Sequence, residues 1–89
     1  MSSGKPKTAR LVSPDLKALG RRLRELRGFD LTQEQMARDL GISQSQLSKY
    51  ERGSAAPPAD VLFFMKKRFQ VSIDWLLTGE GSKPNSQSQ

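Results

Sequence analysis

Apolar residues recur along the middle of the chain with the three- and four-residue spacing of amphipathic helices. The first such stripe consists of Leu16, Leu19, Leu23 and Leu26. It is preceded by Ser13-Pro14-Asp15, and we expect the Ser13 hydroxyl to accept the free amide protons at the helix start. Gly28 is the expected end of this helix, since glycine adopts the left-handed backbone conformation at little cost.

Two shorter helices are predicted from the residues at their ends rather than from a long apolar stripe. Thr32 and Ser43 are each followed three positions later by glutamine, a spacing typical of the reciprocal capping box. A glycine stands after each of the two predicted helices, which cover residues 32–40 and 43–52. Because the corner between them is as short as residues 41–43, the sequence predicts a helix-turn-helix.

Two further helices are predicted after the Pro57-Pro58 break, and Pro58 suits the first turn of the earlier one. The inner stripe of that helix is expected to contain Val61, Leu62, Met65 and Phe69. A short last helix is expected over residues 73–78. Phe63 and Phe64 are adjacent, so at least one should lie near a surface, where it either packs at the domain edge or contacts a protein partner.

Composition narrows the chemistry that this chain can carry. Its 89 residues suffice for one small domain and contain neither cysteine nor histidine. The absence of these residue types removes disulfides, thiolate zinc sites and the usual general base. We therefore expect a protein that is not an enzyme and that uses no metal ion or cofactor.

Charge indicates the kind of partner. The 15 lysines and arginines outnumber nine acids and give a formal net charge of +6, which favours an anionic partner, nucleic acid first. No apolar run approaches the about 18 residues of a membrane span, and the first residues lack the apolar stretch of a signal peptide. We therefore expect a cytoplasmic protein without a membrane partner.

The chain is expected to divide into three segments: a flexible basic arm over 1–12, a domain over 13–80 and a disordered polar tail over 81–89. The basic residues of the arm are Lys5, Lys7 and Arg10. They suit either the wrapping of a duplex or simple solubility, and the second interpretation is preferred.

The predicted helix over 43–52 has little to bury besides Leu47 and Tyr50. Its opposite face is a row of hydrogen-bonding side chains without an acid: Gln44, Ser45, Ser48, Lys49 and Arg52. The major groove of B-DNA admits an α-helix and offers partners for such side chains, with glutamine suited to adenine and lysine to guanine. An ordinary solvated helix usually mixes charges and uses better helix formers, so DNA reading is the preferred interpretation.

The segments LTQEQMARDLGISQSQLSKYERG (31–53) and VSIDWLLTGEG (71–81) strongly resemble the Cro/repressor family of helix-turn-helix proteins, also called the xenobiotic-response-element family. The resemblance covers about residues 16–81 and implies an all-α, compact five-helix bundle of the lambda-repressor-like type. It also implies that the helix over 43–52 enters the major groove while the helix over 32–40 lies across the DNA backbone.

The resemblance assigns roles to individual residues. Gln44, Ser45 and Lys49 match base-reading positions, and Ser48 is a weaker candidate. The expected phosphate contacts are Gln33, Ser43, Arg52 and, among the basic residues of the first helix, Arg21. That Arg21 instead belongs to an ordinary solvated face is an equally open interpretation. Gln33 is also expected to brace the first residue of the recognition helix.

The same resemblance implies a structural ion pair between Glu51 and an arginine of the first helix. Arg27 is the expected partner. The family usually has one residue more than Gly28-Phe29-Asp30 at this point, so Arg24 is the alternative.

Family members commonly bind pseudo-palindromic DNA as two-fold dimers, with recognition helices about 34 Å apart. The implied dimer surface consists of Val71, Ile73 and Leu77, with Phe63 or Phe64 as a possible addition. The leading hypothesis is a sequence-specific DNA-binding regulator from a bacterium or phage, a repressor that excludes polymerase from a promoter.

Three other functions compete with this hypothesis. The first is an antitoxin-type module that binds a protein through the Phe63/Phe64 region and also represses its own operon. An RNA-binding adaptor ranks lower, because the major groove of A-form RNA is too narrow for a helix. An anionic-membrane binder ranks last, because the apolar helix faces are needed for the core.

Overall fold

The computed structural model describes residues 14–81, so the expected arm and almost all of the expected tail lie outside the described residues. The described part contains no strand. Its helices are α2 (Leu16–Arg27), α3 (Gln33–Leu40), α4 (Gln44–Arg52), α5 (Ala59–Phe69) and α6 (Ile73–Thr78). The prediction of an all-α, five-helix bundle is thereby confirmed.

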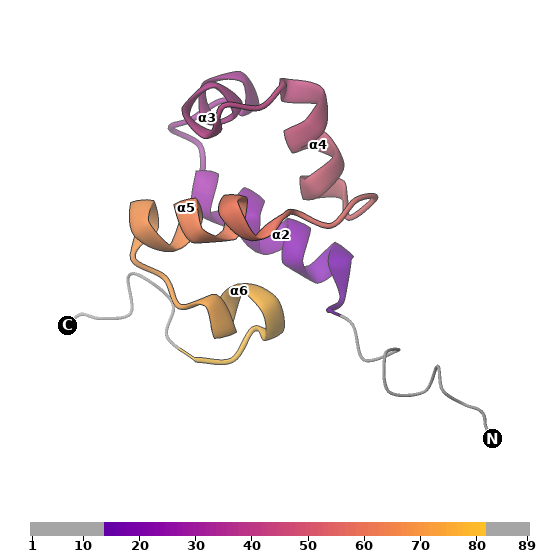
Figure 1. Cartoon of the computed structure of the whole chain (residues 1–89), viewed down its shortest axis with the longest axis vertical. Helices are drawn as coiled ribbons and strands as arrows, with labels where there is room; N and C mark the ends of the chain where they lie inside the picture. The colour runs from indigo at the N-terminus through magenta and orange to yellow at the C-terminus, as the bar shows by residue number, and fades with distance from the viewer. Residues whose placement is uncertain (1–13, 82–89) are drawn as a thin grey trace.

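The first helix is the centre of the bundle (Figure 1). α2 packs against α4 on one side and against α6 on the other, while α3 packs on α4 and α5 on α6. The Arg22 guanidinium adds a polar tie between α2 and α6, since its Nη1 donates to the Leu76 carbonyl oxygen at 2.9 Å. This arrangement leaves the side of α4 that faces away from α2 open to solvent.

The core is built from the predicted stripes. Leu19 and Leu23 of α2 belong to one cluster with buried residues of the other helices, and Leu47 and Tyr50 of α4 point inward as predicted. Burial of each large apolar side chain contributes about 1.5–3 kcal/mol, so this cluster is the main source of stability. Val61 and Met65 of α5 are fully buried, whereas Leu62 and Phe69 pack only partly against the core.

A close approach of two helices holds α4 against α2. A Cβ atom added to Gly20 would lie 2.6 Å from the carbonyl oxygen of Tyr50, so a side chain does not fit there. The backbones of α2 and α4 can therefore meet directly. This contact fixes which face of α4 is turned away from the bundle.

The helix ends agree with the sequence in part. Thr32 and Gln35 form the predicted capping box: the Gln35 amide donates to Thr32 Oγ1 at 3.0 Å, and the Thr32 amide donates to Gln35 Oε1 at 2.9 Å. Gly41 and Gly53 end α3 and α4 in the left-handed conformation, with φ of 75° and 79°. These predictions are confirmed.

Three predicted helix starts were wrong in detail. Asp15, not Ser13, caps α2, because its carboxylate accepts from the amides of Lys17 and Ala18 at 3.1 Å; Ser13 itself lies outside the described residues. Ser43 caps α4 through the Gln46 amide, but Gln46 does not complete a capping box. Its Nε2 instead donates to the Tyr50 hydroxyl at 2.9 Å, one turn further along the same side of the helix.

The third correction concerns α5. Pro58 stands at the N-cap, directly before the helix, rather than within the first turn. Proline lacks an amide proton and offers no side-chain cap, so α5 begins without a capping hydrogen bond.

Candidate nucleic-acid interface

The outward face of α4 is the clearest candidate for a binding surface. Gln44, Ser45 and Lys49 are exposed, as is Arg52, whereas Ser48 is half-buried. Leu47 and Tyr50 anchor the other side of the helix in the core, which turns this row away from the bundle. We call the row Gln44, Ser45, Ser48, Lys49 and Arg52 the α4 face.

Some side chains of the α4 face and its start already have partners within the chain. The Ser43 hydroxyl accepts from the Gln46 amide at 3.0 Å, so it is held at the beginning of the helix. Arg52 Nη1 donates to Ser48 Oγ at 2.6 Å, one helical turn away. The Lys49 side chain is exposed, and its ammonium group has no hydrogen-bond partner within residues 14–81.

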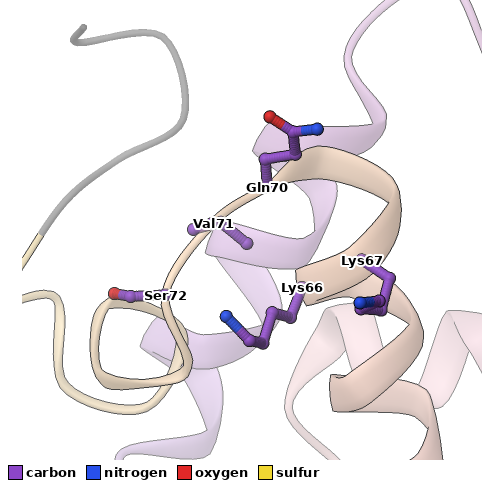
Figure 2. A pocket seen from close by; sticks show the side chains of 5 residues that line it. All are labelled: Lys66, Lys67, Gln70, Val71 and Ser72. Carbon is purple, nitrogen blue, oxygen red and sulfur yellow. The ribbon is translucent and has the colours of Figure 1, made fainter.

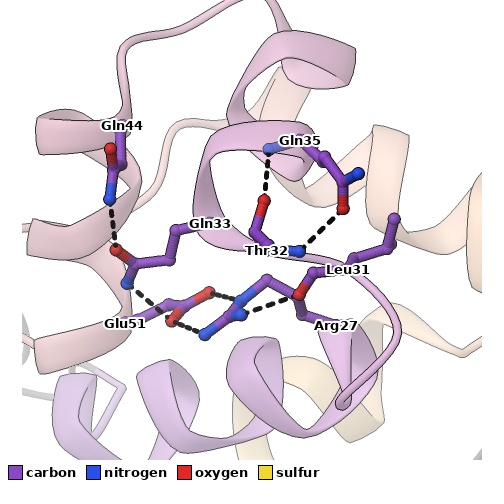
Figure 3. A network of polar contacts seen from close by, with 7 residues as sticks. All are labelled: Arg27, Leu31, Thr32, Gln33, Gln35, Gln44 and Glu51. Carbon is purple, nitrogen blue, oxygen red and sulfur yellow. Dashed lines mark hydrogen bonds and ion pairs between the residues drawn. The ribbon is translucent and has the colours of Figure 1, made fainter.

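A buried ion pair lies beneath this surface (Figure 3). The Arg27 guanidinium meets the Glu51 carboxylate with two parallel hydrogen bonds, from Nε to Oε2 at 2.8 Å and from Nη2 to Oε1 at 2.9 Å. Arg27 Nη1 also donates to the Leu31 carbonyl oxygen at 2.9 Å. The Glu51 side chain is only 4% exposed, so the pair is shielded from water. Removing either partner would leave the other charge poorly solvated.

The hydrogen bonds to Glu51 raise the pKa of Arg27 above its ordinary value, against the opposing effect of desolvation. Arg27 is therefore charged at neutral pH. Of the two arginines considered for this pair, the structure places Arg27 on Glu51. Arg24 is exposed on α2 instead.

Gln33 continues this network to the start of α4. Its Nε2 donates to Glu51 Oε1 at 3.0 Å, and its Oε1 accepts from Gln44 Nε2 at 3.4 Å. Figure 3 shows the resulting series from Arg27 through Glu51 and Gln33 to Gln44. The first residue of the α4 face is thus oriented by side chains from α2 and α3. Arg21 lines the same open hollow as Gln33 and Gln44, so these three predicted contact residues lie together.

The residues predicted for a dimer surface differ in their exposure to solvent. Val71 is 1% exposed and belongs to the core, so its side chain is not presented on the surface of this chain. Val71 lies in the short connection between α5 and α6, and its side chain points into the core. Ile73 and Leu77 are half-buried on α6.

Two exposed aromatic residues stand apart from the core. Phe63 is 60% exposed and Phe64 is half-buried, which confirms that at least one of this pair lies near a surface. Phe29 is fully exposed, and the sequence reasoning gave it no role. The available signal was its position between Gly28 and Asp30, outside the apolar stripes of both neighbouring helices.

A second hollow, of about 390 Å³, lies where α5 passes into α6 (Figure 2). Its lining residues are Lys66, Lys67, Gln70, Val71 and Ser72. Lys67 Nζ lies 5.9 Å from the ring centre of Phe63, and the Ser72 hydroxyl accepts from the Trp75 amide at 2.9 Å. No residue of the α4 face lines this hollow.

Within residues 14–81 no group of three or more acidic, cysteine or histidine side chains is arranged to hold a metal ion. None of the helices in this part of the chain is long and apolar enough to cross a membrane.

Comparison with known proteins gives the class of this fold. A model of the family described as "Helix-turn-helix" matches residues 21–76, which contain α3, α4 and the corner between them. The chain therefore belongs to this helix-turn-helix family, and its resemblance to the xenobiotic-response-element type is confirmed.

Three relatives illustrate the family. The HTH-type transcriptional activator BcrR of Enterococcus faecalis is 45% identical over 60 residues, which are 66% of this chain and 29% of the relative. The uncharacterised HTH-type transcriptional regulator YobD of Bacillus subtilis is 42% identical over 57 residues, or 63% of this chain and 51% of the relative. The antitoxin PezA of Streptococcus pneumoniae is 36% identical over 55 residues, or 61% and 35%. The matched region thus spans about half of these relatives or less.

Proposed function

We propose that this protein is a sequence-specific DNA-binding transcriptional regulator that reads the major groove with α4. The observation that carries the proposal is the α4 face, an outward row of hydrogen-bonding side chains without an acid on a helix anchored by Leu47 and Tyr50. An α-helix fits the major groove, where base edges present donors and acceptors in sequence-dependent patterns. The family membership and the regulator relatives support the same function.

Base reading falls to Gln44, Ser45 and Lys49, with a smaller part for Ser48. The hydrogen bond of Gln44 Nε2 to Gln33 uses one of its two amide protons. The Gln44 oxygen and its second amide proton are left for the N6 and N7 atoms of an adenine. Lys49 is suited to guanine O6 and N7 because its ammonium group donates and cannot accept.

Affinity comes from phosphate contacts by Gln33, Ser43, Arg52 and Arg21. Such contacts set the position of the protein along the duplex and carry no sequence information themselves. Arg52 can leave Ser48 for a phosphate, because a charge-assisted bond to an anion is stronger than a bond to a hydroxyl. Ser48 is then free to meet a base edge.

Two copies are proposed to bind a pseudo-palindromic operator. The two recognition helices would lie about 34 Å apart, one turn of DNA. Ile73 and Leu77 on α6 are the remaining candidates for the contact between the copies, with Phe63 as an addition. Occupation of a promoter would exclude polymerase and repress the gene. One relative is named an activator, so the direction of regulation needs a direct test.

A second candidate function is an antitoxin that binds a protein and regulates its own operon. The observations that favour it are the exposed Phe63 and the relative named an antitoxin. It predicts that an endogenous partner co-purifies with the chain and that the Phe63→Ala variant loses this partner.

Selection of bound duplexes from random DNA tests the proposal. We expect enrichment of one motif containing two half-sites whose centres are about one helical turn apart. A parallel selection from random RNA should give no enriched motif, because a helix does not enter the narrow major groove of A-form RNA. The absence of any enriched DNA motif, or a preference for RNA, would overturn the proposal.

A further inference from the structure

An open hollow of about 960 Å³ lies beside the α4 face, between the C-terminal half of α2 and the start of α3. We call it the α2–α3 hollow. The residues that matter here are Arg21, Arg24, Phe29, Gln33 and Gln44. Gln33 and Gln44 also belong to the proposed DNA interface, so a duplex seated on α4 would pass directly over this hollow.

The charged groups around the hollow favour an anion. Arg21 and Arg24 are exposed, and the ion pairs between described residues involve Arg27 and Arg68 instead. Glu25 is the acid among the lining residues. The charge of Arg27 is matched by Glu51, so the two exposed guanidinium groups outweigh Glu25. The planar fork of arginine is well suited to a phosphate.

The exposed ring of Phe29 distinguishes this hollow from a simple basic patch. Phe29 follows Gly28, whose φ of 67° turns the chain at the end of α2. Its side chain is fully exposed, whereas the other exposed phenylalanine, Phe63, has the Lys67 ammonium group over its ring. A ligand that occupies the hollow should therefore offer anionic groups and an apolar surface side by side.

We propose that the α2–α3 hollow receives the sugar–phosphate backbone of the bound duplex. Arg21 and Arg24 contact successive phosphates, and the Phe29 ring packs against a deoxyribose between them. The inference rests on the proposed function, because its ligand is the duplex read by α4. It adds Arg24 and Phe29 as positioning residues that set how deeply and at what angle α4 enters the groove.

Contacts to the DNA backbone and contacts to base edges should differ in how they depend on the base sequence. Backbone contacts are independent of base sequence, so their loss should weaken binding to every duplex by the same factor. Loss of a base-reading residue such as Lys49 should instead weaken binding to the selected duplex more than to a scrambled one.

The first experiment compares variants on a duplex containing one selected half-site and on a scrambled duplex of equal length. Phe29→Ala should weaken binding to both about tenfold, because a ring that is buried in the complex is lost. Arg24→Gln should weaken both and lower the slope of log K against log salt by about 0.9. The matched control is Lys66→Gln in the second hollow, which should change affinity less than about twofold. Circular dichroism verifies that each variant is folded.

The second experiment replaces Phe29 or Phe63 by the photoreactive p-benzoylphenylalanine in the full chain. Irradiation of the complex should cross-link position 29 to DNA and leave position 63 without a DNA adduct. Equal affinities for wild type and Phe29→Ala, together with no DNA adduct at position 29, would overturn the inference. If Lys49→Ala still lost specificity, the proposed function would survive that result. A wild-type protein without a preference for any duplex would overturn both.

Discussion

The two halves of the bundle share an apolar core and differ in the buried polar network that only one of them contains. Where α2, α3 and α4 meet, a buried carboxylate and its hydrogen-bond partners run from Arg27 to Gln44. Around α5 and α6, the buried side chains are apolar: Val61, Met65, Val71, Trp75 and Leu76. Hydrogen bonds depend on direction, whereas apolar burial depends mainly on area. The comparison indicates that polar contacts align the α4 face and that apolar contacts supply much of the stability behind it.

The largest effect is expected from removing the carboxylate at the centre of the polar half. Glu51→Ala leaves the Arg27 guanidinium shielded from water without its partner and deprives Gln33 of an acceptor. The free energy of unfolding in urea should fall by about 3–5 kcal/mol. The double variant Arg27→Met, Glu51→Leu should recover part of this loss, because no buried charge remains. A loss below about 1 kcal/mol would mean that the pair behaves like a surface ion pair.

Loss of a buried side chain around α5 and α6 should lower the free energy of unfolding without changing the preference for the selected duplex. Leu76 of α6 is completely buried and α6 packs on α2, so Leu76→Ala should lower the free energy of unfolding by about 3 kcal/mol. At a temperature where the variant remains folded, its ratio of affinities for selected and scrambled duplexes should equal that of the wild type. A reduced ratio would show that α6 also aligns the α4 face.

A change on the α4 face should alter DNA binding and leave stability nearly unchanged, which is the reverse of the result expected for Leu76→Ala. Lys49→Ala should weaken binding to the selected duplex by about 1–3 kcal/mol and relax the preference at one base pair. Its unfolding transition should stay within about 0.5 kcal/mol of the wild type, because Lys49 is exposed. Gln46→Ala, on the same helix, is the control, since that side chain bonds to Tyr50 rather than facing outward. Unchanged affinity of Lys49→Ala in competition titrations would mean that the recognition face is misplaced.

The smallest effect is expected on the flank of the interface. Arg21→Ala should weaken binding to all duplexes alike and reduce the salt slope by about 0.9 if the guanidinium contacts one phosphate. Titrations at several salt concentrations measure this slope directly. An unaltered slope would return Arg21 to an ordinary solvated face of α2.

Much of the site was predictable because its signals are local. The row of the α4 face follows from the periodicity of one helix, and its ends follow from Ser43 and Gly53. The pairing of Gln46 with Tyr50 was missed because its side-chain amide has two polar partners within reach, the Ser43 amide one turn earlier and the Tyr50 hydroxyl one turn later. The spacing of residues alone does not choose between them.

The sequence by itself determined the succession of helices, the tight corner between α3 and α4, and the outward row on α4. These depend on backbone hydrogen bonds, capping residues and periodicity within a few turns. The tertiary structure decided that Arg27 rather than Arg24 meets Glu51, that Val71 is buried, and that Phe29 is exposed beside the interface. Each of these outcomes depends on how α2 ends and on how segments far apart in the chain pack. Long-range packing selects among partners that look equivalent in the local sequence. A short stretch of sequence therefore does not show which partner is used.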